Sequence, residues 1–178
     1  MEGCRALLLA ILAPGSVEAE VGRLQGRIFS ECGFASAAAL RPLIPVAFLP
    51  RDEAARELLD SLHGSARAPY RIGTRQLAWA GGYLFLAVDT GGLWQALRAG
   101  APGCSSALFP AFEGFFLGCG ESAPGQRQTV PAAPPALSFS SSMLALLRIE
   151  SPVGPGAWWR EVYCETLHER PLRGRRAG

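Results

Sequence analysis

The chain has 178 residues, a net charge of +2, a hydrophobic fraction of 49% and a charged fraction of 18%. This length suits one domain or two small lobes, and the composition excludes an intrinsically disordered chain. The net charge is too small to drive nucleic-acid binding by charge alone, and all 17 basic residues are arginine, which indicates the codon bias of a GC-rich genome.

An apolar run over residues 5–12, ended by Pro14-Gly15, predicts a buried β-strand. The run ALLLAILA also resembles the hydrophobic part of a signal peptide, but Glu2 weakens the positive flank. It is also too short to span a bilayer. We therefore favour an opening strand and a cytoplasmic protein over an exported one.

Ser16 predicts the N-cap of a helix that Gly33 ends. Gly22 and Gly26 lie four residues apart and are expected to let this helix approach a sheet closely. Its buried face is predicted from the spacing of four apolar residues: Val17, Val21, Leu24 and Ile28.

A second apolar strand is predicted over residues 43–49, although Pro45 inside it lacks a ladder donor. Asp52 is the predicted cap of the next helix, and Gly64 its end. The buried stripe of that helix is expected to consist of Ala55, Leu58, Leu59 and Leu62.

The middle of the chain predicts strands over residues 70–79 and 83–88, joined by the hairpin signal Gly81-Gly82. A short helix over residues 93–99 and a strand over residues 112–117 follow. Residues 118–137 are rich in Gly, Pro and Ser and indicate a long surface loop.

The last two predicted strands cover residues 142–149 and 158–167, and residues 173–178 form a basic tail. Because Trp158 and Trp159 are adjacent on a predicted strand, one is expected in the core and the other towards solvent or a groove. The predicted order is β-α-β-α-β-β-α-β-β-β, which we interpret as one domain over residues 1–172 with two similar lobes.

The order of the elements and the amino-acid sequences of several segments resemble the two-histidine phosphoesterase superfamily. This superfamily includes 2′-5′ RNA ligase-like proteins and cyclic phosphodiesterases. RPLIPVAFLP is similar to the first motif strand of that family, and FPAFEGFFLGC to the second. The resemblance spans nearly the whole chain. It implies an α/β (more narrowly α+β) bilobal fold, in which two antiparallel-rich sheets flank a central groove and the helices lie outside.

The family carries H-x-T or H-x-S in each motif strand, where one imidazole removes a proton and the other protonates the leaving oxygen. The resemblance aligns the histidine positions with Leu43 and Gly114, and the hydroxyl positions with Pro45 and Phe116. Neither triplet offers a proton-transfer group. The resemblance therefore implies that no catalytic residue of the family is present, and we expect no cofactor.

Other reactive residues give weaker signals. His63-Gly64-Ser65 matches H-x-S, but it lies at a predicted helix end, and His168 lies near the end of the last strand. The cysteines are scattered and indicate small buried side chains in a reducing compartment; Cys119 has no partner signature. The serines at positions 138 and 140–142 indicate solvated strand ends. Clustered metal ligands are absent from the pattern.

Four residues are candidate ligand contacts. Arg41, Arg75 and Arg148 are candidates for holding a phosphate, and Trp159, paired with Arg160 or Arg148, is a candidate for stacking on a base. For Trp159, plain packing is the competing interpretation. The arginines of the tail are candidates for contact with phosphate or an acidic partner, with a solubilising tail as the alternative.

The leading functional hypothesis is a non-catalytic relative of the phosphoesterases, a ligand- or partner-binding module with an apolar groove floor at Leu43, Pro45 and Phe116. That floor favours an apolar or peptide ligand, or is simply filled in. One alternative is a divergent phosphodiesterase acting on RNA ends or cyclic nucleotides; another is an exported structural protein. RNA, a nucleotide or a protein is the expected partner, and neither a membrane nor a metal is expected.

Overall fold

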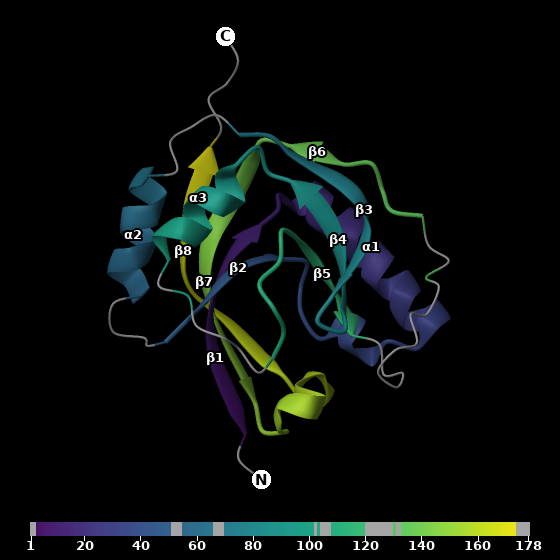
Figure 1. The fold of residues 1–178 in the computed structure, drawn as a ribbon. Coiled ribbons are helices and arrows are strands. Elements are labelled where there is room, and N and C mark those ends of the chain that lie inside the picture. The colour runs from purple at the N-terminus through teal and green to yellow at the C-terminus, as the bar shows by residue number, and fades with distance from the viewer. Residues whose placement is uncertain are drawn as a thin grey trace.

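Two antiparallel four-stranded sheets form the frame of the molecule (Figure 1). The computed structural model describes residues 3–50, 55–65, 70–101, 103, 108–119, 130 and 133–173. The first sheet has the order β2-β1-β7-β8: β2 (Ile44–Leu49), β1 (Cys4–Leu12), β7 (Ser141–Ser151) and β8 (Tyr163–Arg173). The second has the order β5-β4-β3-β6: β5 (Gly114–Cys119), β4 (Tyr83–Asp89), β3 (Ile72–Ala80) and β6 (Ser138–Phe139).

The helices lie outside the sheets. In Figure 1, α1 (Gly15–Cys32) lies on the side of β3, β4 and β5, whereas α2 (Ala55–Ser65) and α3 (Leu93–Gly100) lie on the side of the first sheet. Two 3₁₀ segments complete the described structure: η1 (Ala35–Ala38) and η2 (Pro155–Arg160). The predicted α+β class and the predicted order of long elements are confirmed. Within the described helices, none combines the length and apolar character needed to cross a membrane.

The buried face of α1 is the predicted one, and Gln25 belongs to it as well. Gly33 ends the helix in the left-handed conformation with φ 72°, as predicted. The predicted cap is wrong, because the helix begins at Gly15 and Pro14 is the N-cap, without a side-chain hydrogen bond. The expected close approach at Gly26 is also wrong, since a Cβ there would meet nothing within 4 Å.

The β3–β4 hairpin is confirmed. Gly81 and Gly82 both have positive φ, 57° and 83°, which is the backbone that a two-residue turn of type I′ requires. Pro45 is accommodated because β2 is an edge strand and because the β1–β2 register shifts there, with Leu9 opposite Ala47 and Ala10 opposite Pro45. Edges and bulges are the positions where a sheet tolerates proline.

The carboxy-terminal strands differ from the prediction. Trp158 and Trp159 lie in η2 and not on a strand, because Gly154 and Pro155 start a 3₁₀ segment there. Strand β8 therefore begins at Tyr163 and continues to Arg173, which was predicted as the start of the tail. Strand β6 was not predicted. Gly118 and Cys119, predicted as loop, end β5; residues 120–129 and 131–132, the predicted cap Asp52 and the tail residues 174–178 lie outside the described residues.

The buried side chains form two clusters. The outer cluster joins the sheets to α1, α2 and α3 and contains Leu24, Ile28, Leu59 and Leu97 among others. The inner cluster lies between the faces of the two sheets that are turned away from the helices, because it combines residues of β1, β2, β7, β4 and β5 and includes no described residue of α1, α2 or α3. Its buried members are Leu8, Ala10, Leu12, Leu40, Leu43, Phe48, Phe85, Leu108, Phe109, Phe116, Ala145, Leu147, Ile149 and Trp158.

Candidate functional site

The two predicted motif strands meet where the sheets join. Strands β2 and β5 are the edge strands of their sheets, and the Phe116 N–H donates a hydrogen bond of 3.0 Å to the Leu43 carbonyl. The two segments singled out from the sequence are therefore neighbours, although 73 positions separate Leu43 from Phe116 (116 − 43).

All four motif positions lie on the inner faces of the sheets. Leu43 and Phe116 are fully buried members of the inner cluster. Pro45 lies opposite Ala10, another member of that cluster, and Gly114 shares the face of Phe116 because it is two residues away on the same strand. The positions therefore converge on one space, and the side chains that they place there are apolar or absent.

Gly114 is closely surrounded. A Cβ at this position would lie 2.7 Å from the Leu86 carbonyl oxygen, 3.0 Å from Cδ1 of Phe112 and 3.1 Å from the Ala87 Cα. Two of these three atoms belong to the backbone of β4 and have little freedom to move. The present backbone therefore leaves no room for any side chain at position 114, a histidine included.

Gln25 of α1 bonds to Leu40, just before the first motif segment, and to Phe116 of the second, and it was not predicted as a site residue. Its Nε2 donates to the Leu40 carbonyl at 3.2 Å and to the Phe116 carbonyl at 3.0 Å, and the side chain is buried. The available signal was a lone amide on the apolar face of a helix, a position that needs internal hydrogen-bond partners.

Replacing Gln25 with leucine is expected to lower the free energy of unfolding by about 1–3 kcal/mol, because two buried carbonyls lose a donor. Chemical denaturation measures this change. Gln76→Leu, on an exposed position of β3, is the control and should stay within about 0.5 kcal/mol of the wild type. Equal stability of the two variants would show that Gln25 does not tie the segments together.

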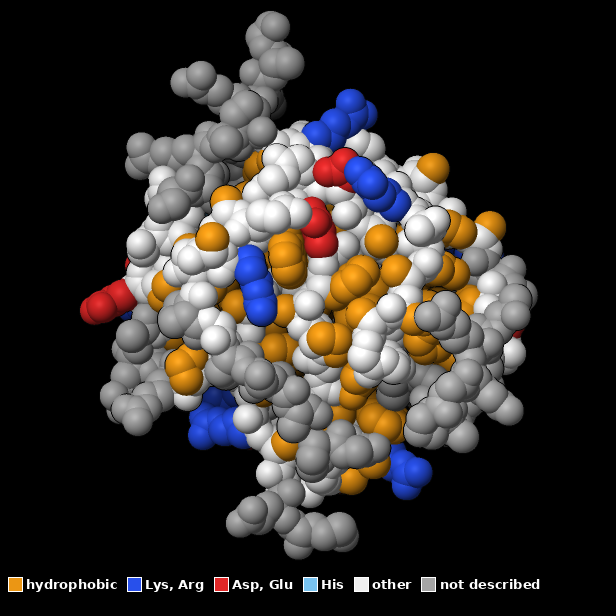
Figure 2. All heavy atoms as spheres, in the orientation of Figure 1, with side chains coloured by type: hydrophobic (Ala, Val, Ile, Leu, Met, Phe, Trp, Pro, Cys, Tyr) orange, Lys and Arg blue, Asp and Glu red, His pale blue; other side chains and the backbone are white. Residues whose placement is uncertain are grey.

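The space between the two sheets, next to the motif positions, is occupied by two aromatic side chains from outside the sheets. Phe109 is 1% exposed and its ring centroid lies 4.7 Å from that of Phe116. Trp158 of η2 is 0% exposed, with ring centroids 5.5 Å from Phe109 and 6.0 Å from Phe116. Figure 2 shows one face of the molecule, where hydrophobic side chains gather in the middle and charged ones lie both beside them and at the edge.

The three candidate arginines do not come together. Arg41 makes a two-point ion pair with Glu18 at the start of α1, with distances of 3.1 and 2.9 Å. Arg75 contacts Asp89 at 2.5 Å. The Arg148 guanidinium lies 3.3 Å from the Glu165 carboxylate. Arg148 is paired with Leu7, a member of the outer cluster, so its side chain is on the outer face of β7 and points away from the motif positions.

The other predicted residues have structural surroundings. Trp159 is partly buried and packs against the inner cluster. Arg148 lies on the opposite side of the sheet, so of the two predicted pairings the one with Arg148 is wrong. His63 lies in the last turn of α2, which continues past the predicted end Gly64 to Ser65, and its Nε2 lies 3.0 Å from the Pro171 carbonyl oxygen. His168 lies on β8 opposite Leu146 of the outer cluster. The side chains of Cys119 and Ser141 lie outside the described residues.

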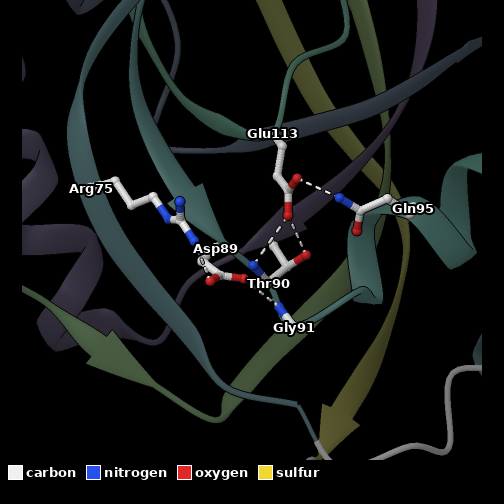
Figure 3. A network of polar contacts seen from close by, with 6 residues as sticks. All are labelled: Arg75, Asp89, Thr90, Gly91, Gln95 and Glu113. Carbon is white, nitrogen blue, oxygen red and sulfur yellow. Dashed lines mark hydrogen bonds and ion pairs between the residues drawn. The ribbon is translucent and has the colours of Figure 1, made fainter.

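A polar network lies beside Gly114, at the end of β4 (Figure 3). Glu113 accepts hydrogen bonds from the Thr90 N–H at 3.1 Å, from the Thr90 hydroxyl at 2.5 Å and from Gln95 at 2.6 Å. The Thr90 hydroxyl also accepts a bond from the Trp94 N–H. The network thus holds the start of α3 against β5, and each of these polar groups has a partner within the chain.

Asp89 in this network provides a pH test. Its pKa lies below the ordinary value, chiefly because the Gly91 N–H donates to the carboxylate and also because Arg75 bonds to it. The stabilising contribution of such a group is complete above the ordinary aspartate pKa of about 4 and is lost as the pH falls through the lower folded-state pKa. Asp89→Asn should therefore show a smaller loss of stability than wild type when unfolding is measured between about pH 5 and pH 2. An equal loss of stability in wild type and in Asp89→Asn over this pH range would contradict the lowered pKa of Asp89.

In the described part of the chain, no group of three or more His, Cys, Asp or Glu residues is arranged to hold a metal ion.

Comparison with solved structures defines the fold: the molecule has a LigT-like fold. TT0787 of Thermus thermophilus superposes with a TM-score of 0.67 and 22% identity over 96% of this chain and 99% of that one. Escherichia coli LigT in its apo form gives 0.59 and 17% over 97% and 99%, and a protein described as a phosphoesterase gives 0.59 and 17% over 96% and 99%. The sequence matches no family model and no curated protein.

Proposed function

We propose that this protein is a non-catalytic relative of the LigT-like phosphoesterases and acts by binding a partner or ligand. One observation carries the proposal: Leu43, Pro45, Gly114 and Phe116 converge between the sheets, and none of these four residues has a side chain that can donate or accept a proton.

Acid–base catalysis of phosphoester cleavage needs a donor and an acceptor of protons within hydrogen-bond reach of the reacting oxygens. Leucine, proline, glycine and phenylalanine provide neither. A phosphate placed among these side chains would also lose its hydration without gaining partners, which costs several kcal/mol. The missing proton donor and acceptor and the uncompensated loss of phosphate hydration both oppose hydrolysis between the sheets.

The surroundings of the arginines support the same proposal. Arg41, Arg75 and Arg148 each bond to a carboxylate of this chain, so a phosphate would have to displace a bound carboxylate at each of them. We also propose a cytoplasmic location, because the apolar run at the start of the chain is built into the first sheet as β1 between β2 and β7.

Turnover of 2′,3′-cyclic AMP and of a 2′-5′-linked dinucleotide tests the proposal. These substrates follow from the fold, and crystal structures of E. coli LigT contain 3′-AMP or phosphate. We expect the purified protein to release product no faster than buffer, while a two-histidine phosphoesterase assayed in parallel releases it readily. Hydrolysis that persists through purification and is lost in Glu113→Gln or Arg75→Ala would overturn the proposal.

A further inference from the structure

Strand β2 has a sequence and a position that favour pairing with a strand of another molecule. Its residues, Ile-Pro-Val-Ala-Phe-Leu over Ile44–Leu49, include no charged side chain, and the strand forms one edge of the first sheet. An apolar edge strand offers unpaired backbone groups to other strands, and proteins protect such edges by covering or charging them. A second copy of this chain carries the same segment, so β2 needs protection from its own counterpart.

Two consecutive carbonyls of β2 accept hydrogen bonds from α3. The Trp94 indole Nε1 donates to the Pro45 carbonyl at 3.0 Å. Nη1 of Arg98 donates to the Val46 carbonyl at 2.8 Å. Val46 is the extra residue of the β1–β2 bulge, because the register passes from Ala47 to Pro45 while β1 advances by one residue. A bulge residue is left unpaired by the neighbouring strand, and α3 therefore bonds the part of β2 that the bulge releases.

The Arg98 side chain is held beside β2 by further contacts. Trp94 lies four residues earlier on the same face of α3, and the guanidinium carbon of Arg98 lies 5.8 Å from its ring centroid. Gly103 is close to both the arginine and the strand, since a Cβ there would lie 3.7 Å from Nη1 of Arg98 and 3.7 Å from the Ala47 Cβ. Among the described residues, no carboxylate bonds to Arg98. Within this part of the chain, its positive charge therefore stays at the edge of β2 without an ion pair.

We propose that Trp94 and Arg98, called the edge cap below, prevent β2 from pairing with β2 of a second copy and so keep the protein monomeric. A second strand would have to displace both donors from their carbonyls and take the guanidinium out of water, and each of these steps costs free energy. The edge cap acts whether or not the space between the sheets binds a ligand, so a failed turnover or ligand test leaves it untouched.

The variant Trp94→Phe/Arg98→Met removes both donors and keeps apolar side chains of similar length at the two positions. Sedimentation velocity over a concentration series should show a monomeric wild type and an associating variant, with association beginning at a concentration roughly tenfold lower or less than in wild type. Hydrogen exchange over residues 44–49 should slow as the variant associates, because the new contact lies at β2. A folded variant that stays as monomeric as wild type, or association without slower exchange there, would overturn the proposal.

Arg23→Met is the matched control, because it makes the same change on α1, where the arginine side chain is 68% exposed. It should sediment like wild type; association equal to that of the double variant would count against the edge cap, since the loss of any surface arginine would then suffice.

Arg98→Met alone decides the question if the double variant does not fold, because Arg98 is exposed and the Trp94 ring is kept. It should associate more than wild type, whereas Arg98→Lys, which keeps the positive charge, should associate less than Arg98→Met. Equal sedimentation of wild type, Arg98→Met and Arg98→Lys would contradict the proposal.

Discussion

Replacing Gly114 with alanine is expected to lower the free energy of unfolding by about 1–3 kcal/mol, the usual cost of overpacking a core. The added Cβ would lie 2.7 Å from the Leu86 carbonyl and 3.1 Å from the Ala87 Cα, and β4 has to shift to make room. Gly114→His, which restores the residue type of the family's motif, should cost more and should not produce hydrolysis of cyclic nucleotides. Urea denaturation and a turnover assay measure the two effects.

Gly26→Ala is the matched control for this change. It adds the same methyl group to α1, where a Cβ would meet nothing within 4 Å. Because alanine is favoured over glycine inside a helix by about 0.8–1 kcal/mol, this variant should gain stability while Gly114→Ala loses it. A gain at both positions would mean that the backbone at Gly114 has room for a side chain, and the loss of the motif would then rest on residue identity alone.

Trp158→Ala is expected to have the largest effect on stability, about 3–5 kcal/mol, because it removes a fully buried ring from the inner cluster. Trp158→Phe keeps part of the ring and removes the donor to the Leu108 carbonyl, so its cost should be smaller, about 1–3 kcal/mol. Thermal and chemical unfolding, followed by circular dichroism, measure the differences.

Tyr163→Ala removes an aromatic side chain that is 64% exposed and lies three residues beyond η2. It should change the free energy of unfolding by no more than about 0.5 kcal/mol. If Trp158→Ala were as mild as this control, the space between the sheets would not depend on being filled by Trp158, and the inner cluster would be open to solvent in solution.

Local signals carried the prediction of the elements. The spacing of Val17, Val21, Leu24 and Ile28 predicted the buried face of α1, and Gly33 predicted its end, because both depend only on the helix itself. The pair Gly81-Gly82 predicted the hairpin for the same reason. Ser16 failed as a cap because Pro14 already has the extended backbone of an N-cap, and the helix starts one residue earlier than the polar side chain suggests.

The candidate site depended on long-range contacts, which a single sequence does not contain. The family resemblance placed Leu43 and Phe116 in corresponding strands, and the structure brings these strands together. The bonds of Gln25 to the Leu40 and Phe116 carbonyls and the packing of Phe109 between the sheets depend on how α1 and the α3–β5 connection pack. Trp158 is the first residue of the last predicted strand, whereas Gly154 and Pro155 start the 3₁₀ segment η2 that contains it.

The arginines show the same limit. The prediction that three arginines could hold a phosphate depended on residue type alone: Arg41, Arg75 and Arg148. Their carboxylate partners, such as Glu18 and Asp89, are known only from the folded structure, which brings distant segments together. Arg148 further depended on strand parity, since its neighbours Leu147 and Ile149 face the inner cluster and the arginine faces the opposite way.

The pairing of β1 with both β2 and β7 affects how the chain folds while the ribosome is still synthesising it. Strands β3, β4 and β5 follow one another closely and pair in sequence order, so the second sheet can form while synthesis continues. β1 pairs early with β2, but its other edge waits for Ser141–Ser151. During that interval the newly made protein exposes an apolar strand edge of the kind that seeds aggregation, and we expect its yield in cells to depend on chaperones that shield this edge.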